Sequence, residues 1–243
     1  MELARFATFH RIRFAGMTDA EMLDLTGRPQ DALAWRIGTA GPVGPDGVRL
    51  PGNVWCGLAL FPDIHSARAV FQSPGEFLPF VDDAAESWHA LIQPFMHRGE
   101  CNILDRNNPG LFFDASFGDP GGPCLVLTSA GFVAGPNLVM ERVLSFRRAV
   151  DRAKEWMDAQ PGILAAEVFT PYTRGEDGFT VSLWKDDESM LAAAYRPGHH
   201  RSEIDRHKSE CVMDRSSFTR SRVMDARGRW NGSDPLQAWS SAS

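Results

Sequence analysis

The sequence contains an internal repeat, and this repeat restricts the possible folds more than any other feature. Residues 54–75 and 179–198 share one pattern, namely an alternating strand, an acidic residue, a short Ala-rich helix and a Pro-Gly pair. An acidic residue satisfies free N–H groups at a helix start, and Pro-Gly ends the helix. The matched pairs are Leu60 and Leu183, Phe61 and Trp184, Asp63 and Asp186, Ala69 and Ala192, Pro74 and Pro197, and Gly75 and Gly198. We interpret this pattern as a duplication, which predicts two similar halves.

Each half is predicted to contain a strand, a helix, two strands, a second helix and a final strand. This order is typical of the ferredoxin-like unit. In the first half the elements are residues 3–14, 18–27, 32–40, 53–61, 64–72 and 84–95. In the second half they are residues 124–133, 138–160, 163–170 and 179–184, a short helix before Pro197, a polar helix at 199–210, and residues 218–230, with a hairpin turn at 173–178.

The fold class expected from this order is α+β, with duplicated ferredoxin-like units in one chain. Two such units can pack their sheets against each other and enclose a core. We place the N-terminal unit at 1–106 and the C-terminal unit, with its ligand-bearing helix, at 124–230. Residues 107–123 are rich in Gly, Pro, Asn and Asp and are predicted to be a linker. Residues 231–243 are predicted to be a frayed tail.

The charge balance gives no reason to expect a nucleic-acid partner. The 243 residues include 25 Lys and Arg against 31 Asp and Glu, for a net charge of -6. A mildly acidic chain has no general attraction to polyanions. At this length folding buries roughly 70–75% of the surface, which is enough for a core and an enclosed pocket.

The cysteines and the termini favour a cytoplasmic protein. The four cysteines, Cys56, Cys101, Cys124 and Cys211, are widely spaced and form no CxxC motif, so we expect reduced core residues. The N-terminus lacks the apolar segment of a secretory signal. No run approaches the ~20 apolar residues of a transmembrane helix, so we expect no transmembrane segment.

The histidines are the main candidate ligand or catalytic residues, because common nucleotide, hydrolase and zinc-protease motifs are missing. His200 and His207 would lie ~10.5 Å apart along a helix and would not share an ion. His207 and Cys211 are four residues apart and could share one. One histidine at a helix start is also compatible with an axial haem ligand. The residues alone leave open that His199 and His200 are simply half-exposed polar groups covering a helix end.

Four blocks together resemble the spheroidene monooxygenase family of bacterial carotenoid biosynthesis. They are RFAG (13–16), AESWHALIQPFMHRG (85–99), FTVSLWKDDESMLAAAYRPGHHRSEIDRHKSE (179–210) and FTRSRVMDARGRW (218–230). The resemblance implies a haem-dependent oxygenase with the dimeric α+β barrel architecture, formed here within one chain. The helix histidine of the family falls on His200, which makes His200 the expected proximal ligand of a haem b iron. His199 is the alternative ligand.

The substrate side of the haem is expected to face the interior of the barrel, with an apolar wall formed by the strands at 54–61 and 179–184. Glu203 is expected to orient the imidazole of His200 through its second ring nitrogen. The polar groups His10, Ser129 and Ser182 are expected to orient oxygen or substrate. The partners expected are a hydrophobic small-molecule substrate and an external electron donor. The chain is expected to be a monomer or a homodimer.

Departures from the family pattern leave other reactions open. After the histidine helix the chain has Cys211-Val212 where the family has Gly-Trp. One alternative is a haem-dependent lyase of the aldoxime dehydratase type, in which iron binds the substrate nitrogen and oxygen is not needed. The other is a haem-free barrel that only binds an apolar ligand.

Overall fold

The computed structural model describes most of both predicted halves. The described residues are 4–16, 29, 31–42, 44, 52–76, 78, 81–100, 121–133, 139–171, 177–195 and 213–237. The predicted helices at 18–27 and 199–210 lie outside them, as does most of the predicted linker. In the described part of the chain, no helix is long and apolar enough to cross a membrane.

Eight antiparallel strands form a closed barrel in the order β1-β3-β2-β6-β7-β5-β8-β4. The first half contributes β1 (Phe6–Arg13), β2 (Ala34–Ala40), β3 (Val54–Phe61) and β4 (Glu86–Gly99). The second half contributes β5 (Cys124–Gly131), β6 (Ile163–Pro171), β7 (Gly178–Trp184) and β8 (Arg215–Gly228). The order within the first half is β4-β1-β3-β2, and the second half repeats it as β8-β5-β7-β6. This repeated order agrees with the duplication predicted from the sequence.

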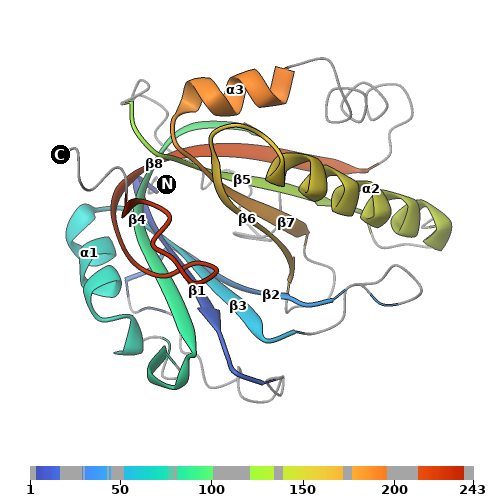
Figure 1. Ribbon diagram of the computed structural model, residues 1–243. Helices are drawn as coiled ribbons and strands as arrows, with labels where there is room; N and C mark the ends of the chain where they lie inside the picture. The colour runs from blue at the N-terminus through green and yellow to red at the C-terminus, as the bar shows by residue number, and fades with distance from the viewer. Residues whose placement is uncertain are drawn as a thin grey trace.

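In the described ranges, three α-helices cover the outside of the barrel (Figure 1). Helix α1 (Ile64–Gln72) packs on β1, β3 and β4. Helix α2 (Met140–Asp158) packs on β6, and α3 (Asp187–Tyr195) packs on β7. Short 3-10 turns occupy Pro74–Glu76 and Val81–Asp83.

The two acidic helix starts predicted from the repeat are confirmed. The Asp63 carboxylate accepts hydrogen bonds from the backbone N–H groups of His65 and Ser66, at 2.8 and 3.0 Å. The Asp186 carboxylate accepts one from the N–H of Ser189 at 2.7 Å. All three bonds satisfy donors that a helix leaves free in its first turn.

The prediction of a frayed C-terminal tail is wrong for residues 231–236. The N–H groups of Asn231 and Gly232 donate to the buried carboxylate of Glu86, at 3.0 and 2.5 Å. Trp230 and Leu236 are buried in the barrel core. The segment folds back against the barrel near β4 and β1 (Figure 1). Its polar composition suggested a flexible end, but the carboxylate that orders it comes from a distant strand.

Candidate functional site

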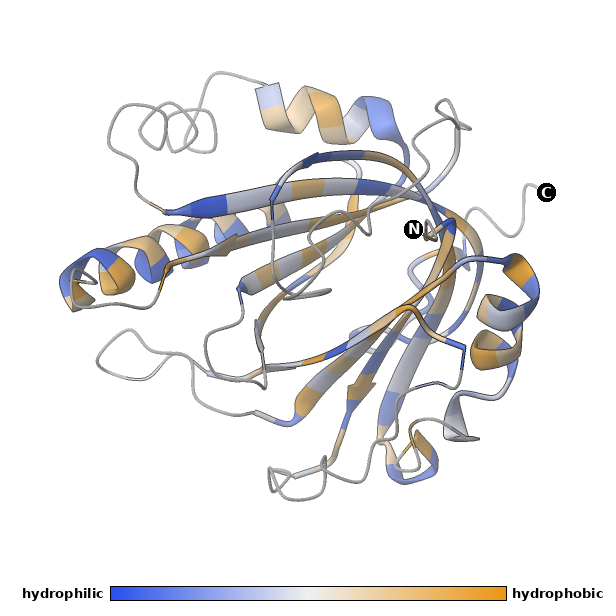
Figure 2. Ribbon diagram, turned by 180° about the vertical axis from the view of Figure 1, so that it is seen from behind, coloured by the Kyte–Doolittle hydropathy of each residue, from blue (hydrophilic) through white to orange (hydrophobic). Residues whose placement is uncertain are grey.

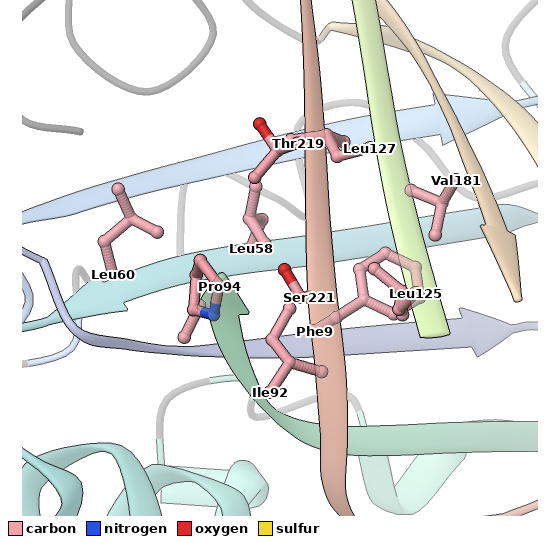
Figure 3. A pocket seen from close by; sticks show the side chains of 11 residues that line it. Phe9, Leu58, Leu60, Ile92, Pro94, Leu125, Leu127, Val181, Thr219 and Ser221 are labelled. Atoms are coloured by element: carbon pink, nitrogen blue, oxygen red, sulfur yellow. The ribbon is translucent and has the colours of Figure 1, made fainter. Parts of the chain in front are cut away.

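The barrel interior is filled by side chains and leaves little space. Eight strands make a barrel just wide enough for side chains to fill. A small cavity lies between aliphatic side chains of β1, β3, β4, β5 and β7, with Thr219 and Ser221 of β8 at its wall (Figure 3). It has room for about one water molecule. The described interior therefore has no room for a prosthetic group, and the expectation that the substrate side of the haem faces it is wrong.

Hydroxyl groups and one imidazole line the C-terminal half of the interior. Ser129, a predicted catalytic residue, lies there and shares a hydrogen bond of 2.7 Å with Ser217. The His97 Nε2 lies 3.2 Å from the carbonyl oxygen of Gly99, which can only accept, so this nitrogen carries a proton. Burial lowers the pKa of His97, so the ring is neutral and its Nδ1 accepts from the Thr219 hydroxyl at 2.8 Å.

His10 lies on the outer face of the barrel, not in the interior. Its neighbour Phe9 points into the core, and strand alternation sends His10 to the other side, which α1 covers. The Nδ1 atoms of His10 and His89 are 2.9 Å apart and share a hydrogen bond. Burial, the other histidine and Arg227 lower the pKa of His10 well below its usual value.

Ser182 also faces outward, in the second half of the barrel. Its hydroxyl accepts a hydrogen bond of 2.9 Å from the indole N–H of Trp184. Val181 and Leu183 on either side of Ser182 point into the core. The three predicted catalytic residues thus lie at three separate places, and the structure does not bring them together.

A charged cluster closes one end of the interior. The Arg11 guanidinium donates to Glu86 at 2.8 Å and to Glu167 at 3.4 Å, and it lies over the ring of Trp230. Burial opposes the charge of Glu86. Hydrogen bonds from Arg13, from the backbone of Gly232 and from Arg11 nevertheless lower the pKa of Glu86 to about 2. The cluster fastens the C-terminal segment to the barrel.

A larger cleft opens on the outer face beside the C-terminal end of α3. It has about 530 Å³ of free space, part of it open to solvent. We name it the α3 cleft. It is lined by Met96, Arg98, Met190, Leu191, Ala194, Tyr195, Phe218 and Arg220. These side chains come from β4, α3 and β8.

The predicted haem ligands follow the α3 cleft directly in the sequence. His199, His200 and Glu203 lie outside the described residues. Tyr195 ends α3 and lines the cleft, and His200 follows five residues later. In the described ranges, no group of three or more His, Cys, Asp or Glu could hold a metal ion.

The apolar face of α2 is only partly covered on the same side of the barrel. Hydrophobic and hydrophilic residues alternate around this helix (Figure 2). The apolar side chains of Val143, Phe146, Val150 and Met157 are half-buried, and Ala149 is the one residue that α2 buries fully. The described residues therefore leave apolar surface next to the C-terminal sheet.

The arginines of the α3 cleft were not singled out as site residues by the sequence analysis. The pattern of β8 contained a usable signal, because Phe218 and Arg220 alternate with the inward-facing Ser217, Thr219 and Ser221. Alternation places both on the outer face. The sequence of the strand does not show which other elements pack on that outer face.

The fold defines the chain as an α+β barrel protein made of duplicated ferredoxin-like halves, which confirms the predicted fold class. No protein-family model matches the sequence, and no curated protein matches it, so the resemblance to spheroidene monooxygenases stays a prediction. Solved structures with the same fold include an aldoxime dehydratase in complex with butyraldoxime. It has a TM-score of 0.57 and 9% identity, over 97% of this chain and 85% of that chain.

Two further solved structures show the same kind of similarity. A second aldoxime dehydratase has a TM-score of 0.55 and 10% identity, over 97% of this chain and 87% of that chain. A proposed monooxygenase from Fusobacterium nucleatum has a TM-score of 0.41 and 13% identity, over 94% of this chain and 96% of that chain. At their identities the two aldoxime dehydratase structures show the fold alone.

Proposed function

We propose that the protein is a haem-dependent monooxygenase that acts on a hydrophobic small molecule at the α3 cleft. The observation that carries this proposal is the position of the cleft. It is lined by apolar and cationic side chains, and His200 follows its last α3 residue within a reach of roughly 17 Å. The barrel interior, with room for about one water molecule, is not an alternative place for a prosthetic group.

The residues of the α3 cleft fit an apolar ring system with acidic substituents. Two methionines and Phe218 provide polarisable, apolar contact surface, and Arg98 and Arg220 provide positive charge. Haem needs one protein ligand and an apolar slot. His200 would hold the iron, with His199 as the alternative, and Glu203 would fix the orientation of the ring. When bound, haem would supply the oxygen chemistry, with electrons from an external donor.

The chain itself would bind the substrate and limit water. The half-buried apolar face of α2 and the side chains of Met190 and Phe218 offer contacts for a hydrophobic molecule. Of the polar groups predicted to orient oxygen or substrate, none lines the α3 cleft. Tyr195 and the two arginines are the polar side chains that do. Substrate orientation is therefore assigned to these residues rather than to His10, Ser129 or Ser182.

The test is the absorption spectrum of the protein purified with haem supplied. We expect a Soret band that is lost or shifted in His200→Ala. His65→Ala is the matched control, because His65 is exposed on α1, which covers the N-terminal half of the barrel. A colourless protein would overturn the proposal and favour a haem-free binding barrel. A Soret band unchanged in both His200→Ala and His199→Ala would remove the assigned ligands.

A second candidate function is an aldoxime dehydratase-type lyase. It is favoured by the match of nearly the whole chain, 97%, to an aldoxime dehydratase fold at a TM-score of 0.57. The two reactions differ in their need for oxygen and reductant. Butyraldoxime should be converted to the nitrile without oxygen if the lyase is correct. Conversion of an apolar substrate only with oxygen and a reductant supports the monooxygenase.

A further inference from the structure

We propose that the α3 cleft binds a carboxylate group of its ligand through Arg98, with Arg220 as a second, fixed guanidinium beside it. This inference rests on the proposed function, because it names a chemical group of the ligand that the same cleft takes. The carboxylate could belong to the cofactor or to the substrate, and the experiment below separates these two sources.

The two arginines lie on the same face of neighbouring strands. In the β4–β8 register, Met96 pairs with Arg220 and Arg98 pairs with Phe218. Arg98 and Arg220 are therefore diagonal neighbours, and such neighbours are ~7–8 Å apart in a sheet. The floor of the cleft alternates apolar and cationic side chains in both directions. A ligand with an apolar body and an acidic edge matches this arrangement.

Arg220 is held in a fixed position by groups outside the cleft. Its guanidinium forms an ion pair with the buried Asp187 at the start of α3 and lies 5.2 Å from the ring centroid of Phe95. Its buried Nε has no hydrogen-bond partner among the described residues. Because Asp187 offsets one positive charge, the pair of arginines leaves a net charge of about +1 at this edge of the cleft.

Arg98 supplies the charge that a ligand can neutralise. Its side chain is exposed near the end of β4 and lines the cleft. A guanidinium can bind a carboxylate through two parallel N–H donors, and such charge-assisted bonds are stronger than neutral ones. An ester or an alcohol of the same shape would keep the apolar contacts and lose this bond. The cleft should therefore prefer an acid over its neutral analogue.

The first experiment compares metal-free protoporphyrin with its dimethyl ester. Binding is followed by quenching of tryptophan fluorescence, so neither iron nor enzyme activity is needed. We expect the native protein to bind the acid roughly tenfold more tightly than the ester. Arg98→Gln should remove this preference. Arg222→Gln is the matched control, because Arg222 is exposed on β8 two residues beyond Arg220 and does not line the cleft; it should keep the preference.

A second arm uses dodecanoate and dodecanol as a pair without a porphyrin. A preference seen only for the porphyrin acid assigns the carboxylate to the cofactor. A preference for dodecanoate that Arg98→Gln removes assigns it to the substrate. Equal binding of acid and neutral partner in both pairs, or equal behaviour of Arg98→Gln and Arg222→Gln, overturns the inference. Haemin binding and its loss in His200→Ala decide the proposed function separately, because they do not depend on the acid–ester comparison.

Discussion

At the scale of single residues, two buried histidines have no counter-ion among the residues that the structure describes. His10 and His89 are paired across β1 and β4, and Arg227 on β8 pairs with His89 on the next strand. The Arg227 guanidinium donates to the carbonyl groups of Phe71 and Gln72 at the end of α1. A proton on either imidazole would therefore place a buried positive charge next to the guanidinium of Arg227. Burial and Arg227 lower the pKa of His89 to about 4.

This arrangement predicts a loss of stability in mild acid. The unfolded chain takes up a proton at His89 below a pH of about 6.5, whereas the folded chain resists it until a pH of about 4. The free energy of unfolding should fall between these values, by on the order of 2–3 kcal/mol for His89. Urea unfolding at pH 7 and pH 4.5 measures this loss. It should be smaller in His89→Gln than in the native protein or in His65→Gln, and equal losses in all three would contradict the prediction.

A second prediction concerns Glu86, whose buried carboxylate binds two arginines and the backbone of the C-terminal segment. Its side chain is 3% exposed and pairs with Arg11 and Arg13, and it accepts backbone bonds from the C-terminal segment. Glu86→Gln should lower the free energy of unfolding by about 3 kcal/mol, since it leaves the buried Arg11 poorly paired. The exposed pair of Lys154 and Asp158 is the control. Asp158→Asn should cost less than about 0.5 kcal/mol.

The stability that Glu86 contributes is also lost in acid, but over a lower pH range than the loss caused by His89. Because its folded pKa of about 2 is below its ordinary value of 4.5, its contribution is present at neutral pH. It is lost as the pH falls from about 4.5 toward 2. A native-like stability of Glu86→Gln at pH 7 would show that the C-terminal segment does not depend on this charge.

At the scale of elements, the strands were predictable because alternation and burial agree. The predicted strand at 124–133 is observed as Cys124–Gly131, and the one at 218–230 as Arg215–Gly228. Both have an inward apolar or hydroxyl face set by the barrel. The ordered segment after β8 was missed, since its hydrogen bonds go to Glu86, far away in the sequence. The sequence also could not show whether His10 and Ser182 face the barrel interior or its outside, because both faces of these strands are buried.

Strands β2 and β3 show how a glycine allows two elements to pack. A Cβ atom on Gly57 would overlap the six-membered ring of Trp35, which lies across the strand at this point. Gly57→Ala should therefore force the indole aside and cost roughly 1–3 kcal/mol in unfolding free energy. Gly16→Ala is a control, because a Cβ there meets no atom within 4 Å. Thermal unfolding of both variants measures the difference, and equal midpoints would show that Trp35 moves freely.

At the scale of the whole molecule, the two halves are joined at two unequal seams. Strands β4 and β8 pair over most of their length, from Trp88–Gly228 to Gly99–Ser217. Strands β2 and β6 pair only at Gly38–Pro171 and Thr39–Thr170 among the described residues. The duplication predicted two similar sheets but not this inequality, because each half alone has the same strand order. The long seam carries Arg98 and Arg220, so the α3 cleft lies on its outer face.

The inequality of the seams predicts where the barrel opens first. Local opening exposes the backbone groups with the fewest neighbouring hydrogen bonds, and it does so at a lower free energy than global unfolding. Amide hydrogen exchange should therefore be fastest, among the strands, at β2 and the end of β6, and slowest along β4 and β8. If His200 binds haem beside the long seam, adding haem should slow exchange along β8 and leave β2 unchanged. Uniform protection of both seams would show instead that the barrel opens only as a whole.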